Sequence, residues 1–259
     1  MKKRIIAIIV AIVLIIPVSR GWYEFLFDNF FDAELASSTQ LKFRKISDTE
    51  VEVVGYDSYL HGSITIPEKI RIGLYEYKVT SIGVEVFSGC SSLTSIKIPE
   101  GVTSIKSSAF LGCSSLTSID IPESLTSIGI YAFWGCSSLT SIKIPEGVTS
   151  IGKWAFDGCS ALTSINIPDG VTSIGSYAFE GCCSLTSINI PDGVTSIGEE
   201  AFWGCSSLTS IKIPKSVTSI GYKAFYGCSN LEIVIDNSEN NVKVGELAFE
   251  GCKSVKWLK

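Results

Sequence analysis

Residues 93–115 read LTSIKIPEGVTSIKSSAFLGCSS, and the same pattern returns along most of the chain. Copies begin 23 residues apart, at Leu93, Leu116, Leu139, Leu162, Leu185, Leu208 and Leu231, and one residue is inserted in the last copy. The cysteines keep the same spacing, at Cys90, Cys113, Cys136, Cys159, Cys182, Cys205 and Cys228, and Cys252 follows after 24. A fixed period of this length predicts an array of identical coils.

One copy, residues 139–161, indicates what each coil contains. Apolar residues alternate with Lys143 in a short strand, a Pro-Glu-Gly turn follows, and a second short strand ends at a glycine. Next comes a segment expected to form one helical turn that ends at Gly158. The expected elements are a strand at 141–144, a turn at 145–147, a strand at 148–151 and a helical turn at 153–156.

The inward residues of that copy are apolar and recur in the other copies. A single coil buries too few side chains to offset the entropy of ordering its backbone, so stability must come from stacking on neighbouring coils. We therefore expect a mainly β repeat solenoid of about eight coils, with two short strands and one helical turn in each. The inward set is Leu139, Ile142, Ile144, Val148, Ile151, Ala155, Phe156 and Cys159.

The first 20 residues differ from the repeats. Three basic residues precede an unbroken apolar run from Ile5 to Ile16, which is typical of a signal peptide or a membrane anchor helix. Val18-Ser19-Arg20 offers no small-x-small cleavage site, so cleavage and anchoring both remain open. We expect an N-terminal helix within 1–20 that contacts a membrane, followed by a linker or interfacial segment at 21–40.

Both ends of the array are atypical, as capping units are. Residues 41–66 are expected to form an N-terminal β-hairpin cap, and 67–259 the solenoid. A nine-residue insertion precedes Val79 in the first coil. The coil that starts at Leu231 is degenerate and contains a polar run at 236–241, and residues 255–258 supply a last strand.

The recurring string LxxIxIPxxVxxIGxxAFxxC closely resembles the BspA-like leucine-rich repeat family, over roughly residues 41–259. The resemblance implies an extracellular or cell-surface solenoid that engages other proteins, on a host or on neighbouring microbial cells. It brings no catalytic residues and implies the fold more firmly than any partner.

Composition and motifs exclude several functions. The chain is 46% hydrophobic with a net charge of −5, which disfavours disorder and nucleic-acid binding. Its one histidine, His61, has no evident triad partner, and no phosphate loop or metal motif is present, so we expect no enzyme activity, cofactor or metal. The repeated cysteines lack zinc spacing and are expected to be reduced and buried. Cys183 replaces a serine, as an exposed thiol or as a tolerated substitution.

Positions where the copies differ are the candidate binding surface, because the coil does not need a particular residue there. One column lies on the first strand, and two aromatic-rich columns flank the Ala-Phe pair. Solvation alone, or packing between coils, is the alternative explanation for each column. The candidates are Lys97, Asp120, Lys143, Asn166, Asn189 and Lys212 on the strand, Tyr131, Trp154 and Tyr177 before Ala-Phe, and Trp134, Trp203 and Tyr226 after it.

A further column of acids follows the prolines, at Glu100, Glu123, Glu146, Asp169 and Asp192. It either attracts a cation or a basic partner, or serves turn formation and solubility.

The sequence is compatible with three functions. The first is an exported, surface-displayed module that binds other proteins, like an adhesin. The second is a structural envelope protein whose solenoids associate with one another. The third is carbohydrate binding by stacked aromatic rings such as Trp154 and Tyr177.

Overall fold

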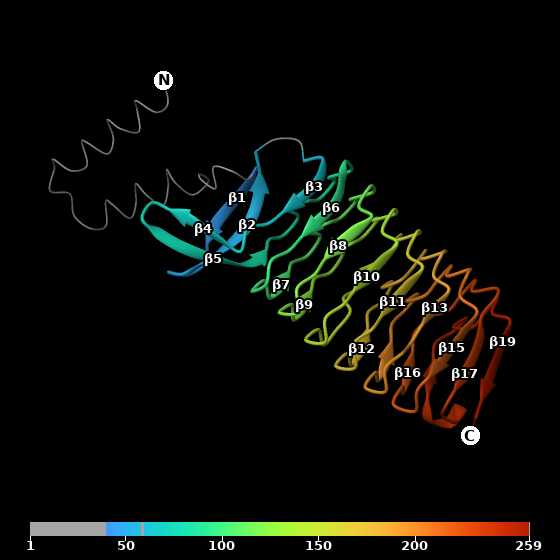
Figure 1. Ribbon diagram of the computed structural model, residues 1–259. Coiled ribbons are helices and arrows are strands. Elements are labelled where there is room, and N and C mark those ends of the chain that lie inside the picture. The colour runs from blue at the N-terminus through green and yellow to red at the C-terminus, as the bar shows by residue number, and fades with distance from the viewer. Residues whose placement is uncertain (1–39, 58–59, 259) are drawn as a thin grey trace, which may run out of the picture. The chain divides into compact units, whose positions relative to one another are not determined.

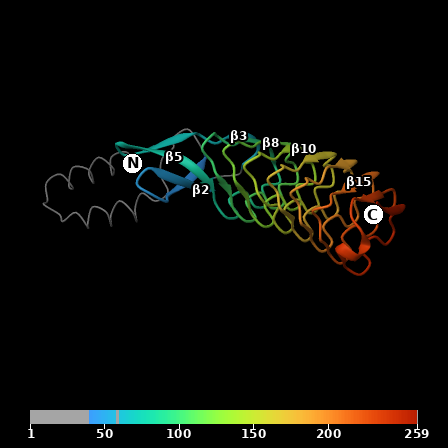
Figure 2. The ribbon, with the colours of Figure 1, turned by 90° about the horizontal axis from the view of Figure 1, so that it is seen from below.

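The computed structural model describes residues 40–57 and 60–258. Within this range the backbone winds into stacked coils that each lie one repeat further along the chain (Figure 1). In a view turned by 90°, the coils again follow one another in the order of the sequence (Figure 2). The repeat solenoid is therefore confirmed. The helix expected within 1–20 and the linker at 21–40, except for Gln40, lie outside the described residues.

The first strands of successive coils form a parallel ladder along one side of the array, which is divided into three three-stranded sheets. Neighbouring strands are in register at the repeat spacing, so that Ile142 pairs with Ile165, and Ile165 with Ile188. The ladder contains β3 (Gly62–Thr65), β6 (Leu93–Lys97), β8 (Ser118–Asp120), β10 (Ser141–Lys143), β11 (Ser164–Asn166), β13 (Ser187–Ile188), β15 (Ser210–Ile213), β17 (Glu232–Ile235) and β19 (Ser254–Trp257).

The second strand of each coil is shorter and pairs in the same parallel way. It is usually the Ser-Ile dipeptide, and in the copy at 139–161 only Ile151 makes a bridge, to Ile174. The members are β5 (Tyr75–Ile82), β7 (Ser104–Ile105), β9 (Ser127–Ile128), β12 (Ser173–Ile174), β14 (Ser196–Ile197), β16 (Ser219–Ile220) and β18 (Lys243–Val244).

The predicted helical turn is wrong. Residues 153–158 form successive turns, with Trp154 in the left-handed region at φ 55° and Gly158 at φ 70°. Backbone N–H groups in this segment donate to the next coil, from Trp154 to Ser176 at 3.0 Å and from Phe156 to Ala178 at 2.9 Å. Because the neighbouring coil supplies these acceptors, the segment satisfies its amides without an α-helical turn. The described residues contain one short 3-10 helix, η1 (Glu239–Asn241).

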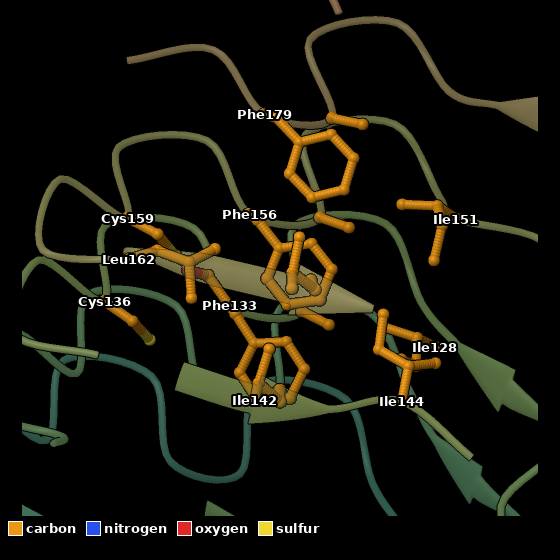
Figure 3. Close-up of a cluster of buried hydrophobic side chains, with 14 of the residues drawn as sticks. Ile128, Phe133, Cys136, Ile142, Ile144, Ile151, Phe156, Cys159, Leu162 and Phe179 are labelled. Carbon is orange, nitrogen blue, oxygen red and sulfur yellow. The ribbon is translucent and has the colours of Figure 1, made fainter. Parts of the chain in front are cut away.

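The core is a set of identical columns inside the coils (Figure 3). Phe133, Phe156 and Phe179 are fully buried, and their rings stack with centroids 5.4 and 5.5 Å apart. Beside them the buried cysteine thiols from Cys113 to Cys228 donate to the carbonyl of a phenylalanine in the preceding coil, as Cys159 does to Phe133 at 3.2 Å, whereas Cys90 donates to the Tyr56 hydroxyl. All nine cysteines are free, as expected.

The N-terminal end of the array is covered by an antiparallel hairpin, β1 (Leu41–Lys45) and β2 (Glu50–Tyr56). Strand β3, which the expected cap range 41–66 included, instead pairs with β6 and belongs to the first coil. The buried carboxylate of Glu52 ties the hairpin to the array through Ser81 and Lys106 and also pairs with Arg44.

The insertion before Val79 forms a second hairpin, in which β4 (Lys69–Ile72) pairs with the start of β5. At the other end of the array, the polar run of the last coil holds η1. The buried Asn237 amide closes that coil by donating to the Lys215 carbonyl at 3.1 Å.

Candidate binding surface

The strand column of candidate residues lies on the solvent side of the first ladder. All six members are exposed: Lys97, Asp120, Lys143, Asn166, Asn189 and Lys212. Lys143 forms an ion pair with Glu123, and Lys212 lies 3.9 Å from Asp236. A hollow of about 430 Å³ opens beside Asn189 and Lys212 and is also lined by acids of the proline row, Asp169 and Asp192. This face therefore carries both signs of charge close together.

The column before Ala-Phe lies on the outer side of the turn segment. There Tyr131, Trp154 and Tyr177 form a continuous ring stack, with centroids 4.7 and 5.0 Å apart and planes within 12° and 4° of parallel. All three are half-buried. Packing between coils thus occurs, and the two faces of Trp154 are covered by the two tyrosines. The stack offers mainly ring edges to solvent.

The backbone at this column is in the left-handed region in every coil. Non-glycine residues there cost roughly 1–2 kcal/mol relative to glycine, which adopts this conformation freely. Each described coil nevertheless carries a side chain at this position. These residues are Glu85, Ser108, Tyr131, Trp154, Tyr177, Glu200, Lys223 and Leu247.

The column after Phe contains two separate aromatic groups. Trp134 is 40% exposed, and its indole N–H donates to Asp157 Oδ2 at 2.8 Å. Two coils beyond Asp157, Trp203 and Tyr226 meet edge to face at 6.1 Å. The structure therefore divides the predicted aromatic residues into a ring stack, a lone tryptophan and a second cluster.

The second cluster holds a lysine of the same chain. The Lys223 ammonium lies 5.3 Å from the ring centroid of Trp203, 5.0 Å from that of Tyr222 and 5.1 Å from that of Tyr226. Cation–π attraction at these distances is favourable, and it keeps the ammonium beside the rings.

Between the two aromatic groups lie acids that sequence reasoning did not select. Asp157 and Glu180 follow Phe in successive coils, and Glu199 and Glu200 come next along the chain. Burial, with the nearby charges of Asp157 and Glu200, raises the pKa of Glu180 to about 7. Burial also raises the pKa of Asp157, and the hydrogen bond that Asp157 accepts from Trp134 partly offsets this increase. The sequence contained a signal for these acids, because residues 157, 180 and 200 are acidic and lie in the two variable columns.

Glu200 is the most enclosed of these acids, with 8% of its surface exposed. Burial raises its pKa, Lys223 lowers it and Glu199 raises it. The carboxylates therefore lie close enough to repel one another at neutral pH.

Cys183 is exposed, with its thiol 3.6 Å from the Ser160 carbonyl. His61 is exposed. In residues 40–57 and 60–258 no three His, Cys, Asp or Glu side chains are grouped to hold a metal ion. No helix in that part of the chain is long and apolar enough to cross a membrane.

Comparisons with known proteins agree with the repeat pattern. The BspA type leucine rich repeat region matches residues 63–182 and 127–256, in six copies. A solved leucine-rich repeat protein of T. pallidum is 28% identical with a TM-score of 0.67, over 77% of this chain and 90% of that one. A comparison with curated proteins finds no match.

Two further solved structures are similar at lower TM-score. One is a leucine-rich repeat protein from Bacteroides ovatus, 27% identical over 85% of this chain and 75% of that one, with a TM-score of 0.46. The other is a leucine rich cell surface protein from Faecalibacterium prausnitzii, 25% identical over 88% and 95%, with a TM-score of 0.41. Because the repeat matches cover most of the sequence between residues 63 and 256, the chain belongs to the BspA type leucine-rich repeat family.

Proposed function

We propose that this chain is an exported, surface-displayed protein that binds other proteins through the outer turn face, defined as the two variable columns that flank Ala-Phe. The observation that carries the proposal is the ring stack of Tyr131, Trp154 and Tyr177 with carboxylates beside it. Exposed aromatic residues are enriched at the centres of protein interfaces. The array holds them in fixed register, which lowers the entropy lost on binding.

Export is supported by the basic and apolar N-terminal residues, where Lys2, Lys3 and Arg4 precede the run from Ile5 to Ile16. Such a segment directs a chain to a membrane. We propose that it leaves the repeats outside the cell, either tethered or released. Binding without catalysis is the expected activity, because family membership brings no catalytic residue.

Carbohydrate binding is less well supported than protein binding. Sugars stack on open aromatic faces, whereas both faces of Trp154 are occupied by Tyr131 and Tyr177. Self-association of the solenoids would use the same columns. The crosslinking experiment distinguishes it from binding to another protein.

Localisation is tested on the full-length protein in its own cells. Protease applied to intact cells should remove the repeats, and N-terminal sequencing of the released and retained chains shows whether residues 1–20 remain attached. Protection of the repeats in intact cells, with digestion only after lysis, would overturn the surface assignment.

Binding is tested by crosslinking on the cell surface, comparing wild type with Trp154→Ala/Tyr177→Ala. The matched control is Lys143→Ala/Lys212→Ala on the strand face. Loss of a heterologous crosslink in the aromatic variant alone supports the proposal. A crosslink only between copies of the chain supports a structural role instead.

A further inference from the structure

The hairpin of β4 and β5 ends in the most exposed large apolar side chains of the described residues. We call residues 69–78 the insertion hairpin. At its turn Leu74 is 98% exposed and Tyr75 is 70% exposed. A Cβ added to Gly73 would meet no atom within 4 Å, so the turn stands clear of the rest of the fold. Two neighbouring apolar side chains on a projecting turn form a surface that favours contact with an apolar partner.

The apolar residues of the insertion hairpin share one face. Ile70 pairs with Tyr77 across the strands, and Ile72 pairs with Tyr75. Paired residues, and residues two apart on a strand, point to the same side of a sheet. Ile70 and Tyr77 are buried in the core, whereas Ile72 is half-buried and Tyr75 exposed. The apolar face therefore continues from the core of the protein out to the turn at Leu74.

The opposite face of the insertion hairpin is charged and mostly basic. Its exposed side chains are Lys69, Arg71, Glu76 and Lys78. Glu76 forms an ion pair with Lys69 at 2.9 Å, and cations outnumber acids three to one on this face. In addition, the ammonium of Lys45 in the cap lies 4.8 Å from the ring centroid of Tyr77. An apolar tip with cations behind it suits a bilayer surface, where apolar groups enter the acyl region and cations meet phosphate headgroups.

The position of the insertion hairpin in the array favours a lipid surface over a protein partner. Residues 1–39 join the described structure at β1, which pairs with β2, and β2 pairs with β5. Figure 1 shows β4 and the start of β5 projecting at this end of the array, opposite the last coil. The apolar run Ile5 to Ile16 lies in the same N-terminal part of the sequence. Residues 17–39 span at most roughly 80 Å, which keeps the cap end within that distance of any membrane that holds the run.

We propose that the tip of the insertion hairpin, formed by Ile72, Leu74 and Tyr75, enters the interfacial layer of the membrane to which residues 5–16 direct the chain. Tyrosine is enriched at this layer because its ring is apolar and its hydroxyl is polar. The inference rests on the membrane-directed N-terminus of the proposed function and not on partner binding. It adds a second membrane contact to an apolar run that is short for a span, and two linked contacts hold more tightly than one.

The test measures whether a thiol at the tip is withdrawn from water. Leu74→Cys is made in the whole chain with Cys183→Ser, which removes the exposed native thiol. The matched site at the far end of the array is Leu247→Cys, because Leu247 is also exposed and apolar. Each chain is placed in lipid nanodiscs of phosphatidylglycerol and phosphatidylethanolamine, which enclose no inner compartment. A thiosulfonate reagent with a fixed positive charge is added, and rates are normalised to those of the urea-unfolded chains.

The Leu74→Cys thiol should react about tenfold or more slowly than the Leu247→Cys thiol, because a low dielectric disfavours the reactive thiolate and the bilayer excludes the charged reagent. Adding Ile72→Ser/Tyr75→Ser should raise the rate at position 74 to nearly that at position 247. The control pair Val84→Ser/Ile130→Ser removes two exposed apolar side chains from the coils and should leave position 74 protected.

Equal rates at positions 74 and 247 would overturn the membrane contact. So would a slow rate at position 74 that persists with Ile72→Ser/Tyr75→Ser, or a chain that separates from the nanodiscs during gel filtration. Far-UV circular dichroism checks that the variants keep their coils. Surface display in intact cells with equal rates at the two thiols refutes the hairpin contact alone. Repeats protected in intact cells, with a slow thiol at position 74, refute surface display alone.

Discussion

Two aromatic columns run through the same turn segment, two residues apart, and differ in what surrounds them. Phe156 stacks on its equivalents with no exposed surface, whereas Trp154 stacks on Tyr131 and Tyr177 and remains half-exposed. The inner column continues unchanged from Phe87 to Phe225, while the outer one has rings only from Tyr131 to Tyr177 and continues as Glu200 and Lys223. The same repeat geometry therefore builds a core on one side and a variable surface on the other.

The largest expected effect comes from removing a ring from each column in turn. Phe156→Ala should lower the free energy of unfolding by about 3–5 kcal/mol, because it leaves a cavity in a closed stack. Trp154→Ala removes a partly solvated ring and should cost about 1 kcal/mol. Urea denaturation measures both, and equal losses would erase the distinction between the columns.

The cysteines sharpen the comparison, because seven are buried in the core, Cys252 is half-buried in the last coil and Cys183 is exposed. In the native protein one thiol should react quickly with a thiol reagent, and Cys183→Ser should abolish that fast phase. Burial raises the pKa of the Cys159 and Cys182 thiols, which lowers their thiolate fraction further. Colourimetric thiol titration with and without denaturant measures this, and a second fast thiol from the buried column would contradict the packing.

The outer acids should reduce stability as the pH rises. Glu180 has a folded-state pKa of about 7 against an ordinary value of 4.5, so the folded state binds more protons than the unfolded state between these values. Its contribution is therefore lost as the pH rises towards and through 7. Glu180→Gln should match wild type near pH 4.5 and be more stable near pH 8. Thermal unfolding curves that shift in parallel at both pH values would contradict this.

The smallest effect is expected on the strand face. Lys143 and Glu123 form an ion pair between exposed side chains, and such pairs contribute little because water screens them. Lys143→Gln should change the free energy of unfolding by less than about 0.5 kcal/mol. A larger loss in urea denaturation would mean that the strand face contributes to stability as the core does.

Most of the fold was predictable because each inward position repeats. The alternation around Lys143 located a strand, and the spacing of Phe and Cys located the core columns, as β10, Phe156 and Cys159 confirm. The turn segment at 153–158 was misread, because a local pattern cannot show that its N–H groups donate to the next coil. The hairpin of β4 and β5 was recognised only as an insertion.

The candidate site was predictable only in part. Variable aromatic residues identified the outer columns, but the acids at 157, 180 and 200 in the same columns were not among the predicted candidates. Their importance depends on burial and on distances between coils, which determine whether a carboxylate is paired. Glu52 of the cap and Glu200 of the repeats are both buried acids, and only the structure shows that Glu52 forms ion pairs with Arg44 and Lys106 whereas Glu200 has only the longer-range attraction of Lys223.

The sequence alone determined the period, the inward residues and the coil architecture, because stacking identical units imposes the same apolar position in every copy. It also determined which positions are free to vary. The tertiary structure decided which variable residues meet: that Tyr131, Trp154 and Tyr177 stack, and that Lys223 lies among three rings and near Glu200. These contacts join residues one repeat or more apart, and their energies depend on burial and dielectric, which no single copy specifies.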